Sequence, residues 1–139
     1  ETDVSEMIIM VQKEVGDRFK SMPGSKDYNS LSVYLQYYFD IEKVCLVSKS
    51  CFVPKPNVDS IVVKFTRKKE LLELKDKELF FKFVRDAFKQ KRKNLRNNLK
   101  EYDLEKVNEV LSKYNLDTSI RAEQVSIDIF VDIANNLDD

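Results

Sequence analysis

Hydrophobic and polar residues follow different patterns in the two halves of the chain. Residues 7–11, MIIMV, form an unbroken apolar run, which is typical of a parallel strand covered on both faces. Residues 13–22 and 29–39 then predict two helices, the first ended by a Pro-Gly pair and the second capped by Ser30. Helical spacing gives the second helix an apolar face made of Leu31, Leu35 and Tyr38.

Two further stretches have the alternation of half-buried strands. Residues 41–48 alternate along their length, and residues 59–68 place Ile61, Val63 and Phe65 on one face. The N-terminal half therefore predicts a strand, two helices, a strand, a loop and a strand.

The C-terminal half has the spacing of amphipathic helices. Residues 77–99, 103–114 and 126–137 each predict one, and the last two begin with the N-cap residues Asp103 and Ser126. The apolar stripe of the first comprises Phe80, Phe83, Val84, Ala87 and Phe88.

A charged connector, residues 68–78, separates the two halves. We therefore expect an α/β unit over residues 1–68, with about three strands, and an all-α domain over 69–139. A buried strand needs neighbours on both edges, and nothing before residues 7–11 could pair with it. The simplest interpretation is that the chain is the C-terminal part of a longer α/β protein. Its exposed strand edge could then pair with a second copy.

The formal net charge is zero, but one segment is strongly basic. Between Ala87 and Lys100 there are six cations and no acid. Such a run suits contacts to nucleic-acid phosphates, although most charge runs are solvated helix faces. Asn94, Asn97 and Asn98 could add hydrogen bonds to sugar or phosphate. The six cations are Lys89, Lys91, Arg92, Lys93, Arg96 and Lys100.

The chain contains no histidine, which excludes Ser-His and Cys-His nucleophiles and histidine-containing metal sites. Cys45 and Cys51 are interpreted as reduced, partly buried thiols, since their spacing is not a zinc framework. We expect no metal and no membrane contact. No apolar run approaches membrane-spanning length and the N-terminus has no signal-peptide pattern, so we expect a cytoplasmic location.

Four segments, taken in order, resemble the ribosomal RNA adenine N6-dimethyltransferases, and the KsgA-type small-subunit enzymes in particular. They are MVQKEVGDRF (10–19), PGSKDYNSLSV (23–33), SCFVPKPNVDSIVV (50–63) and AFKQKRKNLRNNL (87–99). The resemblance covers nearly the whole chain, and the Lys/Arg-rich last segment favours the small-subunit enzymes over relatives that methylate large-subunit RNA.

This resemblance implies the C-terminal part of a Rossmann-like methyltransferase sheet followed by a small helical domain. It implies methyl transfer from S-adenosylmethionine to two adjacent adenines near the 3′ end of 16S rRNA in the small ribosomal subunit. The family's glycine-rich loop, acidic ribose-binding residue and Asn-Leu-Pro-Tyr motif are absent, and Gly16 and Gly24 are the only glycines. We therefore expect S-adenosylmethionine to serve the parent enzyme without binding this chain, which would be inactive alone.

The same resemblance gives Phe52 a role. An exocyclic adenine nitrogen is reached only when the base leaves its stack, and an aromatic ring can hold such a base. Phe52 would stack on the target adenine, beside a loop stiffened by Pro54 and Pro56. Lys49 and Lys55 would hold the RNA backbone there. On composition alone, the favoured interpretation of Phe52 is a core residue, with Pro54 and Pro56 merely ending a strand, and it is the family resemblance that favours the stacking role instead.

Two functions remain open at this point. The chain is either part of an rRNA adenine dimethyltransferase or a stand-alone RNA-binding or assembly module without enzymatic activity. The apolar strand at residues 7–11 favours the first, because it makes sense only inside a larger sheet.

Overall fold

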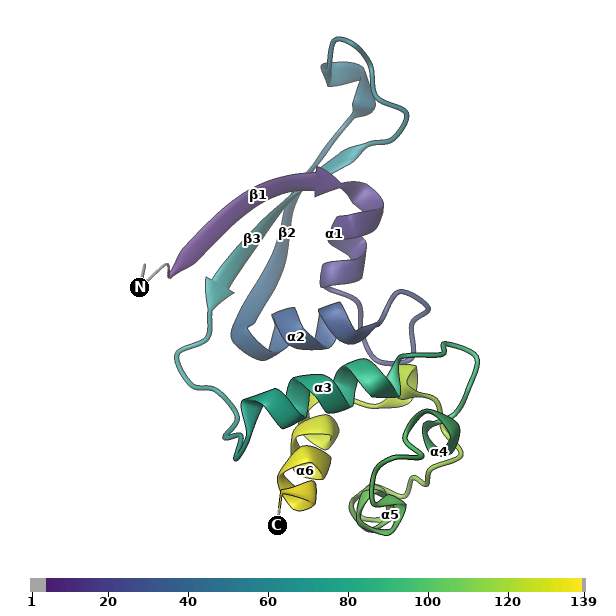
Figure 1. Cartoon of the computed structure of the whole chain (residues 1–139). Coiled ribbons are helices and arrows are strands. Elements are labelled where there is room, and N and C mark those ends of the chain that lie inside the picture. Colours follow the sequence, from purple (N-terminus) through teal and green to yellow (C-terminus); the bar gives the residue numbers. More distant parts are fainter. Residues whose placement is uncertain (1–4, 139) are drawn as a thin grey trace.

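The computed structural model describes residues 5–138 and shows a small sheet on one side of the molecule and a group of helices on the other (Figure 1). The strands are β1 (Glu6–Gln12), β2 (Phe39–Val47) and β3 (Ser60–Arg67). The helices are α1 (Lys13–Phe19), α2 (Ser30–Tyr38), α3 (Lys77–Ala87), α4 (Leu95–Asn98), α5 (Leu104–Ser112) and α6 (Ile127–Leu137). No helix among these residues is long and apolar enough to cross a membrane.

The three strands are arranged in the order β1-β3-β2, and both pairs are antiparallel. The prediction of a parallel strand covered on both faces is therefore wrong for the pairing seen here. Ile8 and Met10 of β1 are exposed, because α1 and α2 pack on the opposite face of the sheet. β1 does lie at an edge of the sheet, as expected, and its pairing with a second copy stays a prediction.

The covered face of the sheet contains Ile61, Val63 and Phe65, as the alternation predicts. Gly16 allows α1 to lie close against it, since a Cβ at this position would collide with Ile61 Cγ2. Phe65 also packs edge-on against Phe19 at the end of α1, with ring centroids 5.7 Å apart.

Helix α2 differs from its prediction in both its cap and its buried face. Its N-cap is Asn29 rather than Ser30, because the Asn29 side chain accepts a hydrogen bond from the Ser32 N–H and Ser32 Oγ accepts one from the Asn29 N–H. Leu31 of the predicted stripe is 45% exposed, whereas Ser32 is buried. The Ser32 hydroxyl also donates to the Arg18 carbonyl, so a polar contact fixes the rotation of this helix. The buried residues of α2 are Ser32, Val33 and Tyr37.

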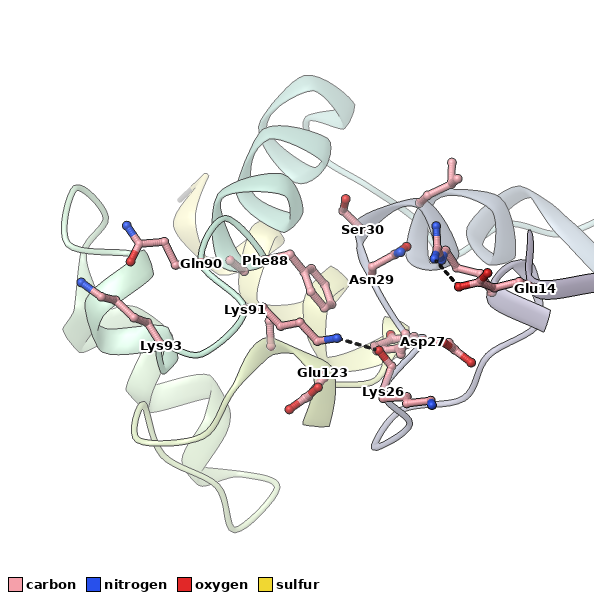
Figure 2. Close-up of a pocket in the computed structure, with 15 residues that line it drawn as sticks. Glu14, Lys26, Asp27, Asn29, Ser30, Phe88, Gln90, Lys91, Lys93 and Glu123 are labelled. Carbon is pink, nitrogen blue, oxygen red and sulfur yellow. Dashed lines mark hydrogen bonds and ion pairs between the residues drawn. The ribbon is translucent and has the colours of Figure 1, made fainter. Parts of the chain in front are cut away.

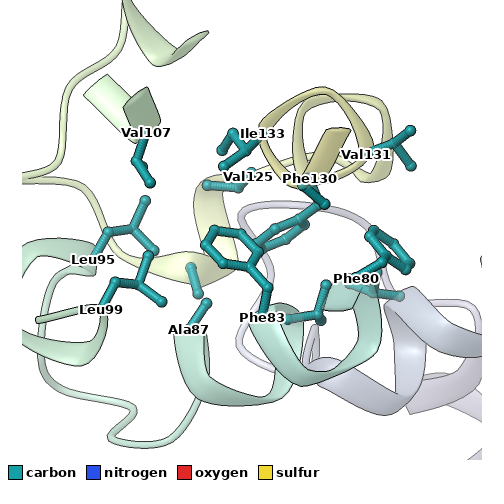
Figure 3. Close-up of a cluster of buried hydrophobic side chains, with 14 of the residues drawn as sticks. Phe80, Phe83, Ala87, Leu95, Leu99, Val107, Val125, Phe130, Val131 and Ile133 are labelled. Atoms are coloured by element: carbon teal, nitrogen blue, oxygen red, sulfur yellow. The ribbon is translucent and has the colours of Figure 1, made fainter. Parts of the chain in front are cut away.

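A second, larger core joins α2 to the C-terminal helices (Figure 3). Tyr37 of α2 packs on Phe80 of α3, with centroids 5.5 Å apart. Phe83 and Phe130 meet edge-on where α3 crosses α6. The larger side chains that are fully buried here include Phe80, Phe83, Phe130, Leu95, Leu99, Leu111 and Ile133.

The predicted helix over 77–99 is broken in the structure. α3 ends at Ala87, and α4 begins only at Leu95. Asn98 stabilises the intervening turn, because its amide donates to the carbonyls of Ala87 and Gln90. The N–H of Leu95 donates to the Ile120 carbonyl at 2.8 Å, which holds α4 against the segment before α6.

The predictions for the other helix caps and for the two cysteines are only partly confirmed. Asp103 caps α5 by accepting from the N–H groups of Glu105 and Lys106, as predicted. Ser126 occupies the N-cap position of α6, but its side chain makes no capping hydrogen bond. Cys45 and Cys51 are free, yet exposed rather than partly buried, because they lie at the open end of β2 and in the turn after it.

Candidate nucleic-acid interface

The loop that carries Phe52 connects β2 to β3 and projects beyond the sheet, at the top of Figure 1. It is fastened at its base, where the Lys49 N–H donates to Asp59 Oδ1 at 2.8 Å. The Asp59 carbonyl in turn accepts from the N–H of Lys13 at 2.9 Å, at the start of α1. These two hydrogen bonds fix the loop beside the carboxyl end of β1.

Side chains in this loop face solvent to different degrees. Phe52 is half-buried, whereas Val53 beside it is 101% exposed. The peptide bond between Val53 and Pro54 is cis. Lys49 is half-buried and Lys55 is exposed. Phe52, Lys49 and Lys55 thus lie on the same loop, and their contacts with RNA stay a prediction.

A cavity of about 610 Å³ lies between the base of this loop and α1. Lys49 and Asn57 line one side, and Lys13, Asp17 and Lys26 line the other. Hydrogen bonds from Lys43 and Lys13 lower the pKa of Asp17 below its usual value. Asp17 therefore stays ionised at neutral pH and balances part of the positive charge.

A second cavity, of about 480 Å³, lies between α1, the loop before α2 and the end of α3 (Figure 2). Its lining includes the Phe88 ring, Lys91 and Lys93 of the basic segment, and Lys26. Lys91 Nζ donates to the Lys26 carbonyl at 3.2 Å. This contact ties the basic segment to the N-terminal half of the chain.

The basic segment, residues 89–100, exposes all of its predicted cations. Arg96 is the most constrained of them, since its Nε donates to Thr118 Oγ1 at 3.4 Å and its N–H to the Thr118 carbonyl at 3.0 Å. Lys89, Asn97 and Lys100 line a smaller cavity of about 210 Å³. The predicted site residues in this segment, all of them exposed, are Lys89, Lys91, Arg92, Lys93, Arg96, Asn97 and Lys100.

Two of the asparagines proposed for RNA have structural partners instead. The Asn94 side chain accepts from the Asn97 N–H and caps α4. Asn98 donates to the carbonyls that close the turn after α3. Asn97 alone of the three has its side chain exposed without such a role among the described contacts.

The predicted site residues form two groups rather than one. Phe52, Lys49 and Lys55 lie on the β2–β3 loop, and the basic segment, which includes α4, lies on the other side of α1 (Figure 1). The two cavities between them share the lining residues Glu14, Lys26 and Asp27. Sequence reasoning missed Lys26, although it lies within the segment PGSKDYNSLSV that carries part of the family resemblance.

The described residues do not fit a site for S-adenosylmethionine. Gly16 is packed against Ile61 and Val63, so it serves helix-sheet packing. Gly24 has a φ of +92° in a surface turn with no neighbouring atom near its Cβ position. Neither glycine belongs to a loop that could cradle a cofactor. Over residues 5–138, no cluster of three or more cysteine and acidic side chains is placed to hold a metal ion.

The sequence profile for ribosomal RNA adenine dimethylase matches residues 1–139. The chain belongs to this family. The resemblance carried by the four segments is therefore confirmed at the level of the family. The match extends over both the sheet and the C-terminal helices, including the Phe52 loop and the basic segment.

The chain is also similar to two named relatives. The chain is 42% identical over 137 residues to ribosomal RNA small subunit methyltransferase A of Bacillus cytotoxicus, which covers 94% of this chain and 47% of the relative. It is 40% identical to the protein of the same name in Bacillus mycoides, with the same coverage. The chain thus spans about half the length of the curated relatives it matches.

Solved structures confirm the methyltransferase-like α/β fold. A dimethyladenosine transferase from Plasmodium falciparum superposes with a TM-score of 0.73 at 22% identity, covering 93% of this chain and 55% of that one. The 23S rRNA methyltransferase ErmE superposes with a TM-score of 0.68, also at 22% identity. The superposition covers 97% of this chain and 55% of the ErmE chain.

Proposed function

We propose that this chain is the RNA-contacting part of a cytoplasmic, S-adenosylmethionine-dependent rRNA adenine N6-dimethyltransferase. Its substrate would be two adjacent adenines near the 3′ end of 16S rRNA, methylated during small-subunit maturation. The observation that carries the proposal is the 42% identity over 94% of the chain to a small-subunit rRNA methyltransferase. The chain alone would be inactive, since the residues present do not fit the methyl donor.

Phe52 would form one wall of the adenine pocket. Methylation of an exocyclic nitrogen requires a base that is out of its stack and held in orientation. The hydrogen bonds from Lys49 and Lys13 to Asp59 fix the loop on which the ring is carried. A partly exposed ring on an anchored loop supports this role better than the alternative of a core residue.

The basic segment would bind the phosphates of the RNA near its target. Its lysines and arginines are exposed, and Leu95 and Leu99 anchor the segment in the helical core. A protein that neutralises phosphates releases counterions, so its affinity falls as salt rises. Lys49 and Lys55 would contribute further phosphate contacts beside the target base.

The test is binding of the chain to a hairpin RNA with the small-subunit 3′-end sequence, measured across a salt series. We compare the wild type with Lys91→Ala/Arg92→Ala/Lys93→Ala. A matched control, Lys69→Ala/Lys77→Ala/Lys113→Ala, removes three cations outside the segment. In the first variant, the slope of log affinity against log salt should fall by about one for each phosphate that is no longer neutralised. The control variant should keep the slope of the wild type.

Equal slopes in both variants would show that the segment is a solvated face and would contradict its proposed role. Methyl transfer is measured separately, in a polypeptide extended to the length of the relatives. RNA binding in the chain, with no methylation by the extended polypeptide, would favour the stand-alone binding module instead.

A further inference from the structure

We propose that the cavity lined by Phe88 holds one unstacked nucleotide of single-stranded RNA. The base would lie on the Phe88 ring, and the phosphate would lie between Lys26 and Lys91. This inference rests on the proposed RNA-binding function and adds a second nucleotide site to it, separate from the Phe52 loop.

The ring of Phe88 is held in place by neighbours. It lies just after the last residue of α3, where it packs edge-on against Tyr28 with centroids 5.8 Å apart. Phe130 of α6 contacts it as well, also at 5.8 Å. The ring is only half-buried, and Figure 2 shows it in the cavity together with Lys91 and Asn29. A fixed and partly exposed ring provides a stacking surface that every base can use.

The charges around the cavity favour an anion. Of its three carboxylates, Glu14 is 3.7 Å from Arg18 and Glu123 is 3.9 Å from Arg121, so both are paired. Lys26, Lys91 and Lys93 therefore outnumber the remaining acid, Asp27. Lys91 already reaches across to the Lys26 carbonyl, and Lys91 and Lys26 both line the cavity together with the Phe88 ring.

The size and rim of the cavity suit a nucleotide. Its volume of about 480 Å³ lies in the range of small-molecule sites. The hydroxyl of Ser30 and the amide of Gln90 on its lining can both donate and accept hydrogen bonds, as the edge of a base requires. The neighbouring cavity, which shares Lys26, continues to Lys49 at the base of the Phe52 loop. A single strand lying in both cavities would connect the two groups of predicted RNA contacts.

The experiment uses the whole chain and a single-stranded 12-nucleotide RNA carrying 5-iodouridine, which cross-links on irradiation to aromatic rings stacked on it. We expect mass spectrometry to locate a cross-link on Phe88. In parallel, affinity for the same RNA without iodine is measured for Phe88→Leu and Lys26→Gln. Lys20→Gln is the matched control, because Lys20 is an exposed lysine outside both cavities. Leucine keeps an apolar contact with Tyr28 and Phe130, and circular dichroism checks that each variant is folded.

We expect Phe88→Leu to weaken binding by at least about fivefold, since stacking of a base on an aromatic side chain is worth this much or more. Lys26→Gln should lower the salt slope by about one, and Lys20→Gln should change neither quantity. Adenosine monophosphate should fail to compete at equal concentration, because a free nucleotide lacks the neighbouring phosphates. Competition by it would overturn the assignment to RNA.

Unchanged affinity in Phe88→Leu, with cross-links only elsewhere, would overturn the cavity site. If the Lys91→Ala/Arg92→Ala/Lys93→Ala variant still had a smaller salt slope than the wild type, the basic segment would remain an RNA-binding surface without the cavity site. Absence of any RNA binding by the wild type would overturn both.

Discussion

The backbone N–H of Lys49 donates to the side chain of Asp59 across the base of the β2–β3 loop, at 2.8 Å. Because the Asp59 carbonyl also accepts from Lys13, one residue joins both strand ends to the start of α1. The position of Phe52 therefore depends on Asp59, although the two residues lie on opposite arms of the loop.

Replacing Asp59 with alanine should loosen this loop. The Lys49 N–H would lose its charged acceptor. Loss of such a hydrogen bond costs about 1.5–3 kcal/mol of stability when the bond is shielded from water. The cost is smaller here, because this bond is only partly buried. Hydrogen exchange should show faster exchange of the Lys49 amide in Asp59→Ala. Asp59→Asn retains an oxygen acceptor and should exchange more slowly than the alanine variant. Equal rates in both variants would show that the side-chain bond does not hold the loop.

Phe52→Ala should lower methyl transfer in a polypeptide extended to the length of the relatives. Removal of a stacking interaction worth about 1–3 kcal/mol corresponds to a fall in kcat/KM of about 5- to 150-fold. Phe52→Tyr keeps the ring and should retain most of the activity. Val53→Ala is the matched control, since Val53 is 101% exposed in the same loop. A core role for Phe52 would instead appear as a fall in unfolding free energy with little change in kcat/KM.

Gly16→Ala should destabilise the sheet half of the molecule. The added Cβ meets Ile61 Cγ2 in a buried contact, and overpacking of this kind costs about 1–3 kcal/mol. Urea unfolding measures the destabilisation. Ile61→Ala removes the colliding methyl group, so the double variant should be more stable than the sum of the two single effects predicts. Additive effects would show that α1 moves away instead.

Tyr28→Phe should cost about 1–2 kcal/mol of unfolding free energy. The Tyr28 hydroxyl donates to the Val125 carbonyl at 2.9 Å in a buried site, and phenylalanine would leave that carbonyl without this partner. Thermal unfolding provides the measurement. Tyr34→Phe is the control, because Tyr34 is 44% exposed and should change the Tm little.

Asp17 gives the chain a pH-dependent contribution to stability. Hydrogen bonds from Lys43 at 2.7 Å and Lys13 at 2.9 Å lower its pKa in the folded state below 3.8. The stabilisation is therefore fully present above pH 3.8 and disappears as the pH falls through the lower, folded-state pKa. The difference in unfolding free energy between wild type and Asp17→Asn should be constant near neutral pH and shrink as the pH falls below 3.8. A difference that does not depend on pH would contradict the ion-pair origin.

Local pattern was enough to predict much of the fold. The alternation around Ile61, Val63 and Phe65 located β3 and its buried face, because side chains on a strand point to opposite sides in turn. The Asp103 cap located the start of α5, since capping involves only the next few residues. The family resemblance was also identified from short sequence segments, without knowledge of the fold.

Contacts between distant segments decided the rest. The apolar spacing of residues 77–99 continues without a break through a segment that forms a turn in the structure. That turn is stabilised by the Asn98 amide, which donates to the carbonyls of Ala87 and Gln90. The hydrogen bond from the Leu95 N–H to the Ile120 carbonyl then holds α4 in place. The rotation of α2 depends on the hydrogen bond from Ser32 to Arg18 rather than on its apolar stripe.

The candidate interface divides in the same way. The order of amino acids was sufficient to indicate which residues could contact RNA, because charge and aromatic character are properties of single side chains. Folding was needed to bring Lys26 against Lys91 and beside Phe88, and to carry Phe52 on a separate loop. Such proximity arises when packing of α2 on α3 and α6 brings the two halves of the chain together, and no local pattern encodes that distance.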